Sequence, residues 1–322
     1  MLIFKVKTSK MKDLRIATAQ FETRNGDKEY NFSRIEELTR QAAEQDARVV
    51  CFHELCITSY TFLKNLDKEE IFGLAEKVPS GESTSRLIEI AAKYHIALLA
   101  GLVEEEDGKL YNTYVCVTEE GMVARFRKLH PFISKYLSAG NEYAVFDLFG
   151  CRCGILICYD NNIIENVRAT VLLGAELIFA PHVTCCTPSS MPGRGWVDPE
   201  LWKNRHDDPH TLRREFDGPK GRGWLMRWLP ARAYDNGIYL VFSNPIGMEG
   251  DQVKNGNSMI FDPYGEIIAE CRSFDDVIAV GLCTADKLEL AGGFRYRKAR
   301  RPELYGHIIG KPHDSSTKVD WM

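Results

Sequence analysis

The sequence has few of the features that mark membrane, nucleic-acid-binding or secreted proteins. No apolar run is long enough to span a bilayer, and the apolar stretch at residues 1–4 is too short for a signal peptide. The 41 basic residues are balanced by 45 acidic ones, a net charge of −4, so neither sign dominates. This balance gives no reason to expect a nucleic-acid or membrane partner. We expect a cytoplasmic protein that binds neither.

The ten cysteines lack the spacing of a metal site or a redox motif. None forms a Cys-x-x-Cys pair, because those at 151–153 and 185–186 stand closer together. His206 and His210 lie four apart, but Pro209 between them disfavours a helical pair of metal ligands. Ten cysteines without a signal sequence indicate reduced thiols. We therefore expect no metal and no other cofactor, and we rank a redox or metal protein last.

The chain is long enough for one large α/β domain. Its 322 residues, 44% hydrophobic, can bury a sizeable core. Alternating or continuous apolar runs predict strands, and apolar residues at helical spacing predict helices. The predicted strands cover 14–20, 48–52, 96–101, 111–117, 121–127, 151–158, 177–180, 238–243, 257–261, 267–269 and 277–282. The predicted helices cover 31–44, 82–94, 163–173 and 222–234. This order predicts a single domain with helices outside two sheets packed face to face.

Two segments break this pattern. Residues 185–221 are rich in Pro, Gly, Trp and charge and show no clear periodicity, so we expect a long inserted loop. Trp196, Trp202 and Phe216 indicate that this loop packs against something. The last segment, 286–322, is predicted to be an irregular tail, basic from Gly292 onward, and is a candidate to wrap a neighbouring subunit.

The stretch Gly154–Asp160 carries the main candidate for chemistry. Its apolar run, 155–157, predicts a buried strand that ends at Cys158, and a helical pattern follows. Strand, cysteine, turn and helix form the order of a nucleophile elbow, in which the following N–H groups favour a thiolate and bind an oxyanion. Taken alone, a cysteine at the end of a strand is more often inert core.

Two further side chains follow predicted strands at their carboxyl ends. Glu54 leaves the apolar strand 48–52, where desolvation raises the pKa of a carboxyl group as a general base requires. Lys128 follows the alternating strand 121–127 and precedes a loop bounded by Pro131. Each alone is more often a surface residue. Together with Cys158 they lie at the edge where open α/β sheets build their sites.

At this point the sequence resembles the nitrilase, or carbon–nitrogen hydrolase, superfamily. Members carry a Glu, a Lys and a Cys in this order and at roughly this spacing. The matching motifs cover about residues 13–285, and they are Phe52-His-Glu54-Leu, Asn112, Arg127-Lys128-Leu-His130, Gly154-Ile-Leu-Ile-Cys158-Tyr159-Asp160, Gly174-Ala-Glu176, Arg232-Ala-Tyr-Asp235-Asn236, Gly256-Asn-Ser258 and Asp262-Pro-Tyr-Gly265. The resemblance implies a nitrilase-like αββα sandwich, single-domain and four-layer-forming.

The resemblance also implies roles for named residues. Cys158 is the expected nucleophile, Glu54 the expected base and Lys128 the expected donor to the developing oxyanion. The residues expected to bind the oxyanion or the substrate are Tyr159, His130, Asn161, Tyr60 and His182. The helix 163–173 is expected to pair two subunits, although its Val167, Val171 and Leu172 could equally be core.

The sequence departs from the family pattern after the lysine. Many members place a second glutamate about seven residues before a glycine, and here that position, counted back from Gly140, is Ile133. No acidic residue lies between Lys128 and Gly140. Asn161 and Asn162 also weaken the case for a carboxylate-bearing substrate like those of the branch acting on N-carbamoyl-D-amino acids. The tail at 296–306 is nevertheless similar to the end of those carbamoylases, so the substrate stays open.

We therefore expect a hydrolase that cleaves a small amide or N-carbamoyl compound through a cysteine thioester and releases ammonia. A nitrile hydrolase is one alternative. Another is a small-molecule binding or regulatory module on the same fold, which the absence of a second glutamate motivates. The expected partners are a small amide substrate and further copies of the chain, as a homodimer or higher homo-oligomer.

Overall fold

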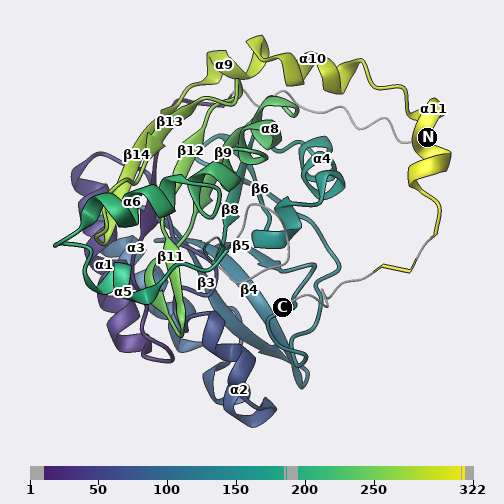
Figure 1. Ribbon diagram of the computed structural model, residues 1–322. Coiled ribbons are helices and arrows are strands. Elements are labelled where there is room, and N and C mark those ends of the chain that lie inside the picture. Colours follow the sequence, from purple (N-terminus) through teal and green to yellow (C-terminus); the bar gives the residue numbers. More distant parts are fainter. Residues whose placement is uncertain (1–10, 185, 187–194, 313, 316–322) are drawn as a thin grey trace.

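The computed structural model describes residues 11–184, 186, 195–312 and 314–315 (Figure 1). The strands of two six-stranded sheets and one hairpin are β1 Leu14–Gln20, β2 Val49–Cys51, β3 Ala97–Glu106, β4 Lys109–Thr118, β5 Gly121–Arg127, β6 Ala144–Leu148, β7 Cys151–Ile155, β8 Leu177–Pro181, β9 Tyr239–Ser243, β10 Ile246–Glu249, β11 Gln252–Asn255, β12 Met259–Phe261, β13 Ile267–Glu270 and β14 Val277–Cys283. The helices are α1 Lys28–Glu44, η1 Thr61–Asn65, α2 Lys68–Leu74, α3 Glu82–Tyr94, η2 Cys158–Asn161, α4 Ile164–Leu172, α5 Pro199–Lys203, α6 Pro209–Asp217, α7 Arg222–Leu225, α8 Leu229–Tyr234, α9 Ala285–Leu290, α10 Gly292–Lys298 and α11 Pro302–Ile309.

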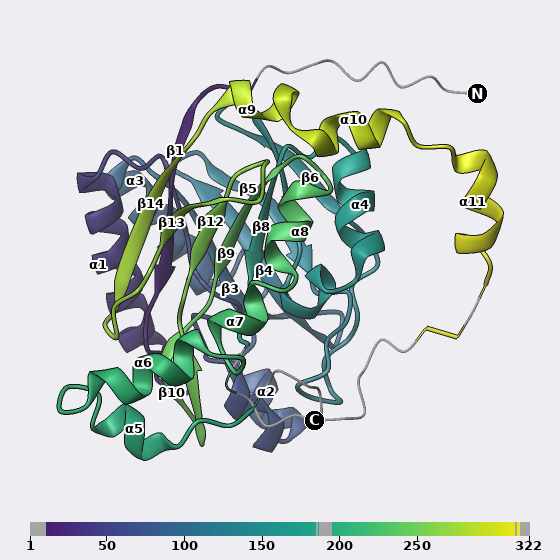
Figure 2. The same ribbon diagram turned by 45° about the horizontal axis from the view of Figure 1, so that its top comes forward.

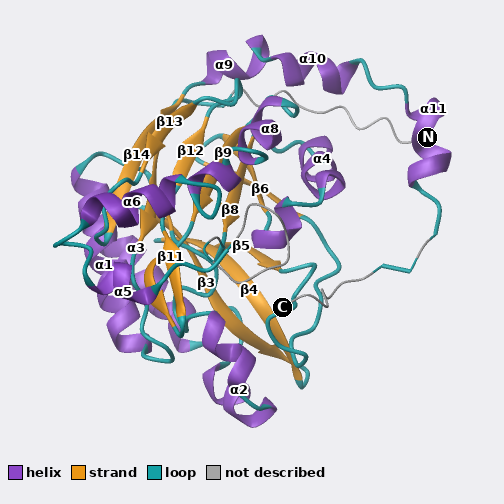
Figure 3. Cartoon of the chain, in the orientation of Figure 1, coloured by secondary structure: helices purple, strands orange, loops and turns teal. Residues whose placement is uncertain are grey.

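The two large sheets lie face to face between helices (Figures 1 and 3). The first has the order β14-β1-β2-β3-β4-β5 and the second the order β13-β12-β9-β8-β7-β6. Three neighbouring strands in each sheet are parallel, β1-β2-β3 and β7-β8-β9, and the outer pairs are antiparallel. Helices α1 and α3 cover the first sheet, and α4 and α8 pack on the second. The expected αββα sandwich in a single domain is confirmed.

Alternation along the strands sends side chains to two cores. In β2, Val49 and Cys51 belong to the cluster between the sheets, whereas Val50 belongs to the cluster under α1 and α3. Both faces of this strand are therefore buried, which explains why its sequence is continuously apolar. Strand β2 ends at Cys51, three residues before Glu54, and β7 of the other sheet ends at Ile155, three residues before Cys158. The residues that follow both strands stay buried.

We expected the segment 185–221 to be a long loop without regular structure, and this prediction is wrong. Residues 185 and 187–194 lie outside the described part, but α5 and α6 occupy much of the rest. Each begins with an Asp N-cap followed by Pro, Asp198-Pro199 and Asp208-Pro209, which is a helix-start signal. Trp202 is 4% exposed and Phe216 fully buried, so the segment packs on the body. Helix α5 has only five residues, too few to show periodicity, and α6 has only two buried apolar residues, Leu212 and Phe216, among polar ones.

Two other predictions need correction. The helix expected at 222–234 is two short helices, α7 and α8, separated at 226–228. The tail beyond residue 285 is not irregular, because α9, α10 and α11 form in it. Helix α11 stands away from the sandwich in both views and has no buried residue (Figures 1 and 2). Across the described ranges, none of the helices combines the length and apolar character needed to cross a membrane.

Candidate active site

The cysteine at the end of β7 sits in a strained turn. Cys158 begins the short helix η2 with a φ of 50°, a left-handed conformation that a residue with a side chain rarely adopts. The strand before it is packed so tightly that a Cβ on Gly154 would lie 2.4 Å from Cγ2 of Thr170 in α4. This close packing fixes the direction in which the chain leaves the sheet. The predicted order of strand, cysteine, turn and helix is present.

Glu54 is buried directly after β2, in the other sheet. It is 1% exposed, and its Oε1 accepts hydrogen bonds from Nζ of Lys128 at 2.5 Å and Nδ2 of Asn112 at 2.6 Å. Its Oε2 accepts no hydrogen bond of normal geometry from the described residues. Burial raises the pKa of Glu54, and the attraction of Lys128 opposes this rise. One carboxylate oxygen is thus held by two donors while the other is left available.

Lys128 is surrounded by one carboxylate and two aromatic rings. Its side chain is fully buried, and its Nζ lies 5.2 Å from the centre of the Tyr60 ring and 4.9 Å from that of Phe132. Burial alone would lower the pKa of Lys128, but the combined attraction of Glu54 and of the neighbouring Tyr60, Cys158 and Asp160 outweighs that effect and raises the pKa well above 10.5. The ammonium group therefore stays charged at neutral pH and can donate to a negative atom in the site.

Cys158 is a neighbour of this ion pair. Its thiol and the Glu54 carboxylate each shift the pKa of the other, as does the charge of Lys128. Burial and the nearby Glu54 raise the pKa of Cys158 to about 12. Burial and the negative charge of Glu54 thus oppose the thiolate that the N–H groups of this four-residue helix favour. A base must remove the thiol proton before the sulfur can attack.

The carboxylate of Asp160 links the residues directly after Lys128, which we call the lysine loop (129–130), to the turn that carries Cys158. Oδ2 of Asp160 accepts a hydrogen bond from the backbone N–H of Leu129 at 3.1 Å, and its Oδ1 accepts one from that of His130 at 3.0 Å. Nδ1 of His130 lies 2.8 Å from Oδ1 of Asp160. The ring of Tyr159 packs edge-on against that of His130. Asp160 therefore sets the distance between Lys128 and Cys158, two residues that come from different sheets.

Asn161 and His182 lie beneath the elbow and are committed to it. Nδ2 of Asn161 donates to the carbonyl oxygens of Leu156 at 2.7 Å and Cys158 at 3.3 Å, and lies 3.2 Å from Nε2 of His182. Both side chains are at most 1% exposed. The contacts of Nδ2 brace the backbone that carries the cysteine, whereas Oδ1 of Asn161 accepts no hydrogen bond from the described residues.

The position expected for a second glutamate is apolar in the structure as well as in the sequence. Ile133 packs against the cluster that contains Tyr60, Leu137 and Val183. The neighbouring Phe132 contacts Lys128 and the ring of Tyr159, at 5.6 Å between ring centres. The described part of the site thus pairs one acidic and one basic side chain within an aromatic and aliphatic surround.

Two residues with clear roles in this geometry carried no assigned function in the sequence. Asn112 appeared only as a motif position, yet it is 1% exposed and donates to Glu54. Asp160 appeared only as the end of the cysteine motif. A polar residue on a buried position of an alternating strand was the signal for Asn112, whereas nothing local indicated the contact between Asp160 and the lysine loop. In the described ranges, no group of three His, Cys, Asp or Glu side chains gathers to hold a metal.

The arrangement has the parts of an acyl-transfer site: a thiol, an adjacent carboxylate and a buried cation. Its scaffold matches a solved structure of a mutant amidase from Nesterenkonia sp. AN1, which shows covalent addition of the acetamide moiety of fluoroacetamide at the active-site cysteine. That match has a TM-score of 0.68 and 24% identity, and covers 92% of this chain and 96% of that one. The likeness shows that the two chains share one fold.

Sequence comparisons give the family. The carbon-nitrogen hydrolase family matches residues 15–289. The omega-amidase NIT2 of Xenopus tropicalis is 30% identical over 86% of this chain and 92% of its own length. The nitrilase of Pyrococcus abyssi is 27% identical over 83% and 88%, and the (R)-stereoselective amidase of Pseudomonas sp is 28% identical over 93% and 96%. The chain belongs to the carbon-nitrogen hydrolase family, and it is an enzyme of that class.

Proposed function

We propose that this enzyme hydrolyses a small linear amide or N-carbamoyl compound through a thioester on Cys158 and releases ammonia. The observation that carries the proposal is the meeting of Cys158, Glu54 and Lys128 in one buried site, although they are separated by 30 to 104 positions in the chain. Relatives named omega-amidase and (R)-stereoselective amidase support an amide over other substrates.

In the first half-reaction, Glu54 takes the proton from the thiol as the sulfur attacks the carbonyl carbon. The developing oxyanion accepts hydrogen bonds from Lys128 and from the backbone N–H of Tyr159. When the tetrahedral intermediate collapses, the carbon–nitrogen bond breaks and the nitrogen takes the proton held by Glu54, leaving as ammonia. The carbon is now bonded to sulfur as a thioester, and Glu54 is again a carboxylate.

In the second half-reaction, Glu54 takes a proton from water as the water oxygen attacks the thioester carbon. The same donors hold the oxyanion. The carbon–sulfur bond then breaks, the sulfur recovers a proton from Glu54, and the acid leaves. Glu54 suits both steps because Asn112 and Lys128 hold one oxygen while the other lies beside the thiol.

The experiment is an ammonia-release screen across amides, N-carbamoyl compounds and nitriles, with the wild type and Cys158→Ala. We expect turnover of an amide or carbamoyl compound that falls by at least about 10,000-fold in Cys158→Ala, because the nucleophile is lost. Cys153→Ala is the matched control, since Cys153 is fully buried in β7 and its electrostatic neighbours are other cysteines rather than Glu54 or Lys128. Intact mass of the wild type during turnover should show the acyl adduct.

Three outcomes would redirect the proposal. Turnover of nitriles alone would favour the nitrile hydrolase, an alternative that the relative named nitrilase supports. Ligand binding without adduct or turnover would favour a binding module. Ammonia release at the wild-type rate in Cys158→Ala would refute the thioester.

We further propose that two copies pair through α4 and that the C-terminal segment lies on the partner. In α4 and just after it, Ile164, Leu172 and Leu173 are 58%, 43% and 56% exposed, whereas Val167 and Val171 are core. Helix α11 has no buried residue and exposes Leu304, Ile308 and Ile309. Unpartnered apolar surface of this kind marks an interface.

Sedimentation velocity tests the pairing. We expect the wild type to be a dimer or a higher assembly of dimers, and Leu172→Glu with Leu173→Glu to be a monomer. Leu282→Glu is the control, because Leu282 is 48% exposed on β14, outside both α4 and the segment 286–322. A monomeric wild type at micromolar concentration would contradict the proposal.

A cytoplasmic location belongs to the same proposal. All nine cysteines in the described part are buried and none is paired in a disulfide, which suits a reducing compartment. Cell fractionation tests it, and recovery of the enzyme outside the cytoplasm would contradict it.

A further inference from the structure

A second buried glutamate lies close to the site but has no part in the chemistry described above. Glu249 ends strand β10, in the hairpin β10–β11 that belongs to neither large sheet, and it is 3% exposed. Its Oε1 accepts hydrogen bonds from Oγ of Ser59 at 2.9 Å and from the backbone N–H groups of Tyr60 at 2.5 Å and Thr61 at 2.8 Å. Its Oε2 accepts one from Oγ1 of Thr61 at 2.7 Å.

All the described hydrogen-bond partners of this carboxylate are neutral. Taking a carboxylate out of water costs several kcal/mol unless hydrogen bonds replace those to water. Glu249 meets that cost with four donors, all supplied by residues 59–61 at the start of η1. A carboxylate that gathers the first N–H groups of a helical turn fixes both the position and the direction of that turn.

Residues 59–61, which Glu249 holds, lie in the connection that runs from β2 and Glu54 to η1. The first half of this connection is tied to neighbouring backbone: the N–H of Ile57 donates to Gly101, and that of Gly26 to Thr58. The second half begins at Ser59, which has a φ of 73° and is therefore in the left-handed region. The carboxylate of Glu249 accepts hydrogen bonds from the side chain of Ser59 and from the backbone N–H groups of the two residues after it.

The position of this turn places the side chain of Tyr60 beside Lys128. Its ring centre lies 5.2 Å from Nζ of Lys128, and the residue is only 4% exposed. Its hydroxyl is buried and makes no hydrogen bond of normal geometry with the residues that the structure describes. A buried hydroxyl without a partner is costly in a resting protein, and it becomes useful when a ligand supplies the missing partner.

We propose that Glu249 is a positioning residue that holds residues 59–61 so that the hydroxyl of Tyr60 meets the bound substrate beside Lys128. Tyr60 is the substrate-contacting group, and Glu249 acts only through it. This inference rests on the proposed function, because it assigns the role of Tyr60 within the same reaction.

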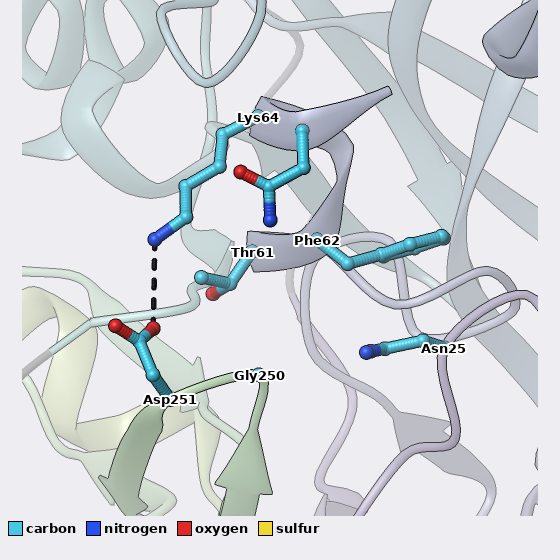
Figure 4. Close-up of a pocket in the computed structure, with 7 residues that line it drawn as sticks. Asn25, Thr61, Phe62, Lys64, Gly250 and Asp251 are labelled. Atoms are coloured by element: carbon cyan, nitrogen blue, oxygen red, sulfur yellow. Dashed lines mark hydrogen bonds and ion pairs between the residues drawn. The ribbon is translucent and has the colours of Figure 1, made fainter.

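The outer contact between the same two segments provides a control. Nζ of Lys64, in η1, lies 3.5 Å from Oδ1 of Asp251, in the hairpin turn (Figure 4). This pair borders an open pocket of about 310 Å³ that is lined by Asn25, Thr61, Phe62, Lys64, Asn65, Gly250 and Asp251. The two side chains are 39% and 73% exposed, so their ion pair is weak. Asp251→Asn cuts this outer link and leaves the buried one intact.

The test is a double-mutant cycle in kcat with Glu249→Ala and Tyr60→Phe, measured on the best substrate of the screen. We expect Tyr60→Phe to lower kcat by about 30-fold, because the substrate contact is lost, and Glu249→Ala by about 10-fold, because a contact misplaced by about 1 Å has an effect of this size. The double variant should lose about 30- to 50-fold, well below the product of about 300-fold for independent sites. Asp251→Asn should stay within about 2-fold of the wild type.

A merely structural role gives a different result. If Glu249→Ala lowers the melting temperature but leaves kcat at the wild-type value, or if the two effects multiply, the inference is overturned. Should Glu249→Ala fail to fold, Glu249→Gln replaces it in the cycle, because its amide oxygen still accepts from both backbone N–H groups. We then expect about a 5-fold loss that vanishes in the Tyr60→Phe background.

The cycle also separates this inference from the proposed function. Retained turnover in Cys158→Ala defeats the proposed function, whatever Glu249 does. A fully dependent Cys158 combined with independent effects at positions 60 and 249 defeats this inference alone.

Discussion

Two buried carboxylates close to the same loop have opposite surroundings. Glu54 begins the connection to η1, and Glu249 contacts its end from another part of the chain. Both oxygens of Glu249 accept hydrogen bonds from fixed neutral donors. Glu54 shares one oxygen between Lys128 and Asn112 and keeps the other beside the thiol of Cys158. A carboxylate with every oxygen occupied holds structure, and one with an available oxygen beside a nucleophile can move a proton.

A third buried carboxylate, that of Glu104, shows that burial alone does not make a carboxylate available for proton transfer. The side chain of Glu104 is fully buried, as is that of Glu54, and it forms ion pairs with Arg125 at 2.8 Å and Arg127 at 2.6 Å. Oγ1 of Thr113 also donates to it. It has basic partners as Glu54 does, but both of its oxygens are occupied. The comparison therefore predicts that equal changes at the two positions have unequal effects on turnover.

The largest expected effect comes from replacing Glu54, the proposed proton acceptor. Glu54→Gln keeps the size and the hydrogen bonds of the side chain but removes its basicity, while burial keeps the Cys158 thiol protonated. We expect kcat to fall by about 1,000-fold or more, as for the loss of a general base that serves both half-reactions. The measurement is ammonia release on the best substrate.

Glu104→Gln is the matched control for this change. It should leave kcat within about 3-fold of the wild type and act mainly on stability, because the charge of its two arginine partners is no longer matched. Equal losses of kcat in the two variants would mean that burial, rather than the available oxygen, distinguishes Glu54.

The next largest effect is expected from replacing Lys128, the cation that pairs with Glu54. Lys128→Met removes the proposed oxyanion donor and leaves the Glu54 carboxylate buried without its ion-pair partner. We expect kcat to fall by about 100- to 1,000-fold, and the free energy of unfolding to fall by about 3–5 kcal/mol. Chemical denaturation of the single variant and of Glu54→Gln with Lys128→Met measures the second effect.

The double variant decides between two causes of that instability. It should regain most of the lost free energy of unfolding, because a neutral pair needs no compensating charge. If it is no more stable than Lys128→Met, the instability comes from packing around the lysine rather than from an unpaired buried charge.

The smallest expected effect is the pH dependence. Burial raises the pKa of Glu54, and below that pKa the carboxyl group is protonated and cannot accept the thiol proton. The value of kcat/KM should therefore fall as pH falls through a midpoint above 4.5, by about tenfold per unit at the steepest. The pKa of Cys158, near 12, and that of Lys128, well above 10.5, lie beyond the assay range, so the rate should be level from neutral pH to about pH 9. A limb centred near pH 8.5, typical of a free thiol, would contradict a base-dependent nucleophile.

Much of the fold could be predicted because its elements are long and strongly patterned. The strand at 14–20 and the helix at 82–94 have the predicted bounds. Short elements were not predicted: α5 has too few residues for periodicity, α6 has only two apolar positions at helical spacing, and the hairpin β10–β11 shows little alternation. The single helix predicted at 222–234 is two helices, α7 and α8, because residues 226–228 between them form a turn.

The site was predicted unevenly for a similar reason. Glu54, Lys128 and Cys158 each end a recognisable strand, so the sequence could place them at one edge. The roles of Asp160 and Glu249 depend on contacts with residues 30 to 190 positions away, and no local pattern marks such contacts. Nor could local sequence give the pKa of Cys158, because the N–H groups that favour a thiolate are local whereas its burial and its negative neighbour are not.

The sequence by itself determined the elements that repeat over several residues, the family and the three side chains most suited to acyl transfer. Hydrophobic periodicity and motif spacing are local properties of the chain, so they can be read without coordinates. Only the tertiary structure decided which oxygen of Glu54 is available, which carboxylate holds Tyr60, and that the thiol rests protonated. Each of these depends on desolvation and on charges brought together from distant segments, which exist only once both sheets have packed.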